Sequence, residues 1–82
     1  MALVLYHRLA DPDSAAVRAW IVERGIKPRI DFQNVETEGA DAFAALGGVR
    51  IPALWDGARL HEGVDAIRVA VGAIIRAEEH AR

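Results

Sequence analysis

The sequence predicts an α/β fold in which a mixed four-stranded sheet is flanked by three helices. Apolar runs of strand length alternate with segments of helical periodicity, an Asp-Gly turn separates two short strand candidates, and an amphipathic segment closes the chain. The predicted element order is βαβαββα. A right-handed crossover makes the first two strands parallel, and the closing hairpin adds antiparallel strands.

The first half of the chain predicts a buried strand, a capped helix and a second strand. Residues 2–6 are continuously apolar, as in a strand that is buried on both faces. In residues 11–14 (Asp-Pro-Asp-Ser), the first aspartate suits a helix cap, the proline suits the first turn, and the second aspartate complements the helix dipole. The helix is expected to end at Gly25, and residues 29–35 predict the next strand.

The second half predicts a short helix, a hairpin and a long helix. Residues 40–46 are rich in alanine and are followed by two glycines, which is typical of a short helix with a left-handed end. Residues 49–55 and 58–61 flank an Asp-Gly pair and predict an antiparallel hairpin. From Val64 onward an apolar stripe at helical spacing predicts the last helix.

Composition limits the domain count and the chemistry. The 82 residues are enough for one domain, which we expect to cover residues 1–82. There is no cysteine, so dithiol oxidoreductase chemistry is excluded. The net charge is −2 with no basic cluster along the chain, and His7 and His61 are isolated, so we expect no nucleic-acid partner and no metal site. No signal peptide or membrane span is recognisable, which predicts a cytoplasmic protein without a membrane partner.

Several segments resemble glutaredoxins and the N-terminal domain of glutathione transferases. Residues 5–14 resemble the first strand and active loop of a glutaredoxin, with residues 11–14 at the positions of its Cys-Pro-Tyr-Cys. Residues 48–54 resemble the segment through the cis-proline, in the Pro-Ala-Leu version that is typical of the transferases. Residues 56–57 and 61–63 resemble the hairpin and the substrate-binding turn that follow. The resemblance covers nearly the whole chain and implies a thioredoxin-like fold in its glutaredoxin form.

The resemblance also implies a glutathione or peptide groove beside a cis-proline. Ile51, which precedes Pro52, would pair its backbone with the cysteinyl backbone of glutathione, in the manner of an added strand. Arg8 would lie at the basic position for the glycyl carboxylate. The alternatives are that the cis-proline serves only the turn geometry of the fold and that Arg8 is a solvated surface residue.

A second part of the implied groove lies at the start of the last helix. Glu62, Gly63 and Asp65 would hold the γ-glutamyl end of glutathione, with free helix N–H groups for its carboxylate and Asp65 for its ammonium group. Ordinary helix capping is the alternative for Gly63 and Asp65. Transferases have Glu-Ser where this chain has Glu62-Gly63, so the chain departs from their pattern at this point.

Two residues are catalytic candidates. Ser14, the only serine, lies near the position at which some glutathione transferases keep a thiolate-stabilising hydroxyl. Tyr6 lies near the catalytic tyrosine of several others. The alternatives are a capping role for Ser14 and a core position for Tyr6. Asp11 and Asp13 would oppose a thiolate beside Ser14.

These observations lead to three hypotheses for function. The first is a redox-inactive glutaredoxin-like binding or interaction module for glutathione, an extended peptide or a protein partner. The second is a glutathione transferase-like enzyme that uses Ser14 or Tyr6 to activate glutathione. The third is a structural or dimerisation module without a ligand, and we expect either a monomer or a homodimer. Glutathione is the only cofactor that the resemblance implies.

Overall fold

The computed structural model describes residues 3–80 as an α/β arrangement of one four-stranded mixed sheet and three α-helices. The elements follow the predicted order βαβαββα, with one additional short 3₁₀ helix before the second strand. Their bounds are β1 Leu3–His7, α1 Pro12–Glu23, the 3₁₀ helix η1 Lys27–Arg29, β2 Ile30–Asn34, α2 Ala40–Ala45, β3 Ala53–Trp55, β4 Leu60–Glu62 and α3 Val64–His80.

The sheet has the strand order β2-β1-β3-β4. Strands β1 and β2 are parallel, with Leu5 opposite Phe32. Strand β3 is antiparallel to both β1 and β4, and Leu54 lies opposite Leu5 on one side and His61 on the other. The crossover through α1 and the closing hairpin therefore produce the mixed sheet that the sequence predicts.

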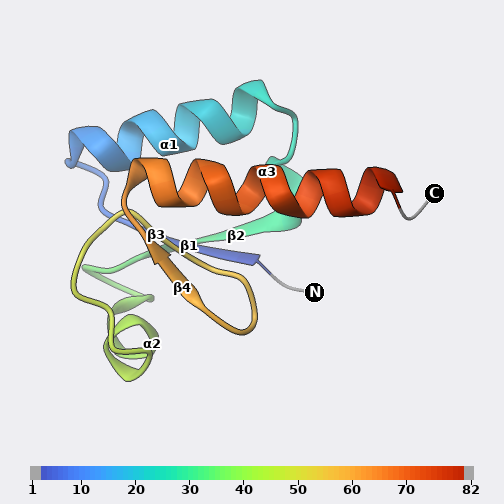
Figure 1. The fold of residues 1–82 in the computed structure, drawn as a ribbon. Coiled ribbons are helices and arrows are strands. Elements are labelled where there is room, and N and C mark those ends of the chain that lie inside the picture. The colour runs from blue at the N-terminus through green and yellow to red at the C-terminus, as the bar shows by residue number, and fades with distance from the viewer. Residues whose placement is uncertain (1–2, 81–82) are drawn as a thin grey trace.

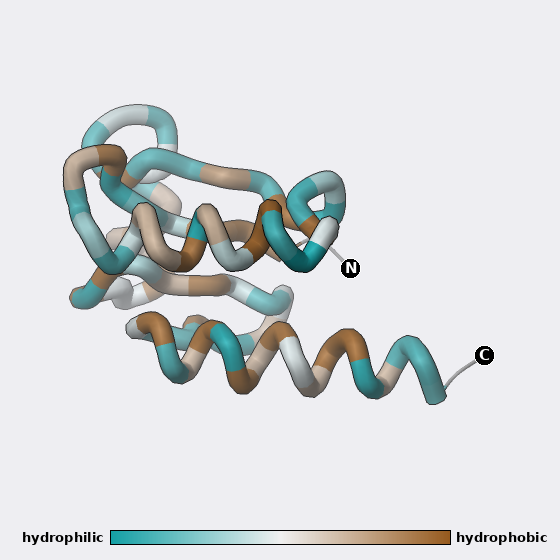
Figure 2. Tube along the Cα trace, turned by 90° about the horizontal axis from the view of Figure 1, so that it is seen from above, coloured by the Kyte–Doolittle hydropathy of each residue, from teal (hydrophilic) through white to brown (hydrophobic). Residues whose placement is uncertain are grey.

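Helices α1 and α3 lie side by side on one face of the sheet, and α2 lies on the other (Figure 1). The core forms between the sheet and the two long helices, and hydrophobic positions recur along α3 until its hydrophilic last turn (Figure 2). Burial of this apolar surface is the main stabilising contribution. The core residues are Leu3, Leu5, Val17, Ile21, Ile30, Leu54, Ile67 and Val71.

Helix α2 makes a smaller contact with the opposite face of the sheet. Its Phe43 ring lies 5.4 Å from the ring of Tyr6 in β1, measured between centroids. A Cβ atom built on Gly48 would lie 2.2 Å from the Phe43 ring, so any larger residue here would require this ring to move. The two glycines expected at the end of this helix thus have different roles. Gly47 adopts the left-handed conformation, with φ +76°, and Gly48 leaves room for the Phe43 ring.

The predicted bounds of the hairpin were wrong. The strand expected over residues 49–55 begins only at Ala53, because Pro52 has no N–H with which to continue the ladder. The strand expected over residues 58–61 begins at Leu60, because the Asp56 carboxylate accepts the N–H groups of Ala58 and Arg59 and extends the turn. The predicted strand over residues 29–35 loses a residue at each end, because Arg29 belongs to η1 and β2 ends at Asn34. The predicted start of the first strand, Ala2, lies outside the described residues.

Candidate functional site

The loop between β1 and α1 is held together by side chains of residues 11–14. Asp11 caps α1, as predicted, and its Oδ2 accepts the Ser14 N–H at 2.7 Å. Ser14 itself is completely buried, and its Oγ accepts the backbone N–H of Arg8 at 3.2 Å. The hydroxyl of Ser14 therefore stabilises the loop and is not on the surface that a ligand would contact.

The other catalytic candidate, Tyr6, is also buried. Only 5% of Tyr6 is exposed, and its ring packs against Phe43 of α2. The structure places neither catalytic candidate on an open surface. Tyr6 is a core residue, as its alternative interpretation has it, whereas Ser14 bonds to the loop before the helix and the cap of α1 is Asp11.

Sequence reasoning missed Arg18, which fixes the same loop from α1. Its guanidinium donates to His7 Nδ1 at 3.0 Å and to the carbonyl oxygens of Arg8 and Leu9 at 3.2 and 3.3 Å. Because arginine can only donate, His7 Nδ1 is the acceptor, and the proton of the neutral ring lies on Nε2. Burial, followed by the charge of Arg18, lowers the pKa of His7 below its usual value of 6.5.

An open groove of about 370 Å³ lies at the start of α3. It is formed by the first turn of α3, the end of β4, the residue before Ile51-Pro52, and the first turn of α1. A groove of this size accommodates a small molecule or a short peptide segment. Its lining residues are Asp13, Arg50, Glu62, Gly63, Val64, Asp65 and Ala66.

Backbone and side-chain bonds join the two sides of this groove. The Gly63 N–H donates to the Pro52 carbonyl oxygen at 2.8 Å, and the Gly63 carbonyl accepts the first helical bond from Ile67. Gly63 has φ +96°, which a residue with a side chain rarely adopts. The Glu62 carboxylate accepts the backbone N–H of Arg50. The segment around the Ile51–Pro52 bond, which is cis, is thus tied to the start of α3.

The groove presents both donors and carboxylates. A Cβ atom built on Gly63 would lie 3.5 Å from Nη2 of Arg50, so this guanidinium lies beside the start of α3. Within residues 3–80, the N–H groups of residues 64–66 have no hydrogen-bond partner, as is usual for the first turn of a helix. Three carboxylates, those of Asp13, Glu62 and Asp65, line the same groove. The arrangement can hold an anionic group and an ammonium group next to each other.

The predicted binding residues are only partly brought together. Glu62, Gly63 and Asp65 line the groove, and Pro52 is joined to it by the bond from Gly63. Ile51 is half-buried, and in the described part of the chain neither its N–H nor its C=O has a partner. Arg8 does not line the groove.

Arg8 is largely exposed and forms an ion pair with Glu36, with 3.8 Å between Nε and Oε1. The groove is lined instead by one arginine, Arg50, and by the acidic Asp13, and sequence reasoning selected neither of them as a binding residue. The sequence feature that could have identified Arg50 is its position directly before Ile51-Pro52. A residue at this position lies next to the expected ligand groove.

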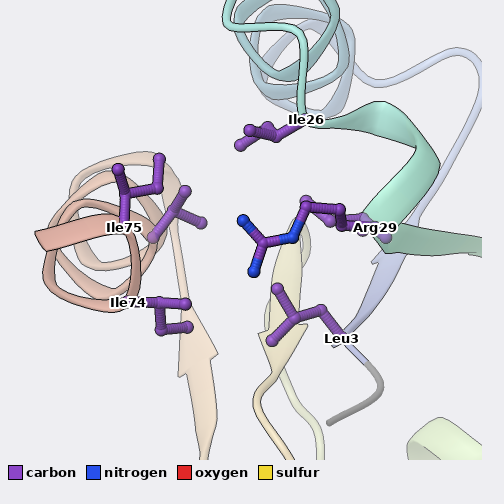
Figure 3. A pocket seen from close by; sticks show the side chains of 7 residues that line it. Leu3, Ile26, Arg29, Ile74 and Ile75 are labelled. Carbon is purple, nitrogen blue, oxygen red and sulfur yellow. The ribbon is translucent and has the colours of Figure 1, made fainter. Parts of the chain in front are cut away.

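A second cavity lies at the opposite end of the core, between η1 and α3. Figure 3 shows Leu3, Ile26, Ile74 and Ile75 around the guanidinium end of Arg29. Arg29 pairs with Glu78 across this opening. The cavity volume is about 10 Å³, roughly the room that one water molecule needs, so it holds no ligand of useful size.

The His61 ring contacts Asp56 in the turn of the hairpin, with 2.8 Å between Nε2 and Oδ2. This contact, followed by the backbone N–H groups of Arg59 and Ala58, lowers the pKa of Asp56 to about 2. Among residues 3–80 no group of three His, Asp or Glu side chains is arranged to hold a metal ion. The pair therefore orders the turn.

Comparison with protein-family models, with curated proteins and with solved structures found no match. No helix in the described part of the chain is long and apolar enough to cross a membrane. Assignment of a fold family and a ligand therefore depends on the sequence motifs and on the geometry of the groove at α3.

Proposed function

We propose that the chain is a redox-inactive, glutaredoxin-like domain of thioredoxin-like fold that binds glutathione in the groove at the start of α3. The observation that carries this proposal is the composition of the groove. The unpartnered N–H groups at the start of α3 and the guanidinium group of Arg50 can hold a carboxylate there, and the carboxylates of Asp13, Glu62 and Asp65 line the same groove. The γ-glutamyl end of glutathione carries an α-carboxylate and an α-ammonium group side by side, which complements this set of charges.

The backbone of Ile51 supports the same ligand. Its N–H and C=O have no partner within residues 3–80, and the next residue is joined through Gly63 to the groove. An extended ligand lying along this segment would pair with both groups as an added strand does. In glutathione, the cysteinyl residue would take this position while the γ-glutamyl end reaches α3.

The burial of Ser14 and Tyr6 favours binding over catalysis. A residue that activates glutathione has to touch its sulfur, whereas Ser14 is fully buried and Tyr6 is packed against Phe43. Neither residue that the transferase-like hypothesis names therefore lies on an open surface. If glutathione and peptides do not bind, the third hypothesis, a structural or dimerisation module, is favoured.

The experiment is an NMR titration of the ¹⁵N-labelled chain with reduced glutathione. We expect saturable shifts of the Ile51, Gly63 and Val64 amides, and Arg50→Gln should weaken binding about tenfold because it removes a charged hydrogen-bond donor. Arg59→Gln is the matched control, since it removes the same charge from the exposed hairpin turn. Absence of shifts at millimolar glutathione, or equal weakening by both variants, would contradict the proposal.

A second ligand separates glutathione recognition from general peptide binding. The tripeptide Glu-Cys-Gly with an ordinary α-peptide bond has the same atoms and charges as glutathione but presents its first residue differently. If the groove recognises the γ-glutamyl end, this isomer should bind at least about tenfold more weakly. Equal affinity would indicate an extended-peptide module.

The alignment of residues 11–14 with the Cys-Pro-Tyr-Cys of glutaredoxins can be tested separately. Because the chain has no cysteine, any thiol detected comes from the introduced residues. In the double variant Asp11→Cys with Ser14→Cys, the two thiols would be the only ones in the chain. Asp11 already reaches the N–H of residue 14, so the two positions are close enough for an intramolecular disulfide. Thiol titration before and after mild oxidation should detect two thiols and then none, in a monomer. A folded double variant that keeps both thiols would show that the proposed register is wrong.

A further inference from the structure

A second open groove lies between the two long helices, away from the groove at the start of α3. Its volume is about 400 Å³. Its lining residues lie in α1 and α3, except for Arg24, which directly follows α1. The glutathione proposal does not involve any of these residues. The lining includes Trp20, Arg24, Arg68, Gly72, Arg76 and Glu79.

Three guanidinium groups converge on this groove. The Cζ atoms of Arg24 and Arg68 lie 5.4 and 5.8 Å from the centroid of the Trp20 ring, so both cations are held against one indole. Arg68, Gly72 and Arg76 follow one another at a spacing of four residues and therefore share one stripe of α3. The α1–α3 groove thus has positive charge on both walls.

The charge of the groove differs from that of the molecule. Three arginines and one glutamate give the lining a net charge of +2, whereas the whole chain carries −2. Within residues 3–80 the ion pairs involve other residues, and none joins Arg24, Arg68 or Arg76 to a carboxylate. Unpaired like charges that are held close together repel one another, and an anion between them would remove this repulsion.

Gly72 leaves space on the floor of the groove. A glycine in the middle of a helix is less favourable than an alanine, and here no backbone or core side chain requires it. A Cβ atom at this position would meet only Nη1 of Arg76, at 3.4 Å. The missing side chain therefore keeps the floor open beside a guanidinium group.

We propose that the α1–α3 groove is a binding site for a small, multiply charged oxyanion. Guanidinium groups bind phosphate and carboxylate oxygens in pairs, and this geometry suits a polyphosphate or a polycarboxylate molecule equally. Arg24 and Arg68 bind from the side of the indole, and Arg76 binds from the next turns of α3. Glu79 also lines the groove, and its charge disfavours an anion placed next to it.

The probes are inorganic pyrophosphate and citrate, with sodium chloride at equal ionic strength as the reference. In a Trp55→Phe background, Trp20 is the only tryptophan, and its fluorescence should change saturably with one or both oxyanions and not with chloride. A response to pyrophosphate alone assigns a phosphate ligand, and a response to citrate alone assigns a polycarboxylate. In the unsubstituted chain, the Gly72 amide should shift with the same midpoint in NMR spectra.

Matched charge variants decide whether the groove itself is responsible. Arg68→Gln and Arg76→Gln should each weaken the oxyanion response about tenfold, whereas Arg59→Gln, in the hairpin turn, should leave it within about twofold. Gly72→Ala should also weaken it, because the added methyl group occupies the floor. A response that does not saturate, or that Arg59→Gln weakens as much as the groove variants do, overturns the proposal. The Gly63 amide reports glutathione and the Gly72 amide reports the oxyanion, so the two sites can fail separately.

Discussion

Replacement of Ser14 by alanine should reduce stability without affecting the binding of glutathione. Ser14 is completely buried, and its hydroxyl accepts the Arg8 N–H at 3.2 Å, so Ser14→Ala leaves this donor without its acceptor. The loss of a buried acceptor costs about 1 to 2 kcal/mol. For a domain of this size, the corresponding decrease in Tm is roughly 4 to 16 °C.

Urea denaturation followed by circular dichroism measures this change. The midpoint should fall while the m-value stays constant, because the surface exposed on unfolding does not change. Thr37→Ala is the matched control: it removes the only other aliphatic hydroxyl, which is exposed, and should change the free energy of unfolding by less than about 0.5 kcal/mol. If Ser14→Ala kept full stability but no longer bound glutathione, the hydroxyl would contact the ligand and the assignment of Ser14 to the loop would be wrong.

Three further changes test the packing around the two grooves. Gly72→Ala should raise the free energy of unfolding by about 1 kcal/mol, measured by the urea midpoint, because alanine is the better helix former and only the mobile end of Arg76 has to shift. Gly63→Ala should lower it by about 1 to 3 kcal/mol in the same assay, because φ at this position is +96°. The pKa of His7 is lowered in the folded chain, so the unfolded chain binds the proton first as the pH falls below 6.5. The urea midpoint should therefore fall between pH 7.5 and pH 5, and this fall should be smaller in His7→Gln, whereas an equal fall in both proteins would assign it to other groups.

The order of the elements could be predicted from the sequence because each one carries a local signal. Asp11 and Pro12 mark the start of α1, Gly47 marks the end of α2, and the Asp-Gly pair at 56–57 lies in the hairpin turn. The lengths of β3 and β4 could not be predicted in this way. The start of β3 depends on Pro52, which has no N–H for the ladder, and the start of β4 depends on the Asp56 side chain, which takes the N–H groups of Ala58 and Arg59; hydrophobic patterning does not record either effect.

The candidate site was less predictable than the fold. Glu62, Gly63 and Asp65 were selected from a local motif, and they lie together because they are neighbours in the chain. Arg50 and Asp13 reach the same groove from distant segments, and Arg18 bonds to a loop ten residues before it in the chain. Such contacts depend on helix placement and side-chain direction, for which one sequence contains no direct signal.

The charges near the start of α1 also indicate what would happen to the thiol of glutathione if it lies in the groove as proposed. Dithiol proteins lower the pKa of a thiol at a helix N-terminus through the helix dipole and nearby cations. This chain instead has two aspartates there, and Asp13 lines the groove. Carboxylates raise the pKa of a neighbouring thiol, so the sulfur of the bound ligand should stay protonated at neutral pH. Together with the burial of Ser14, these carboxylates mean that the proposed groove would bind glutathione without activating its thiol.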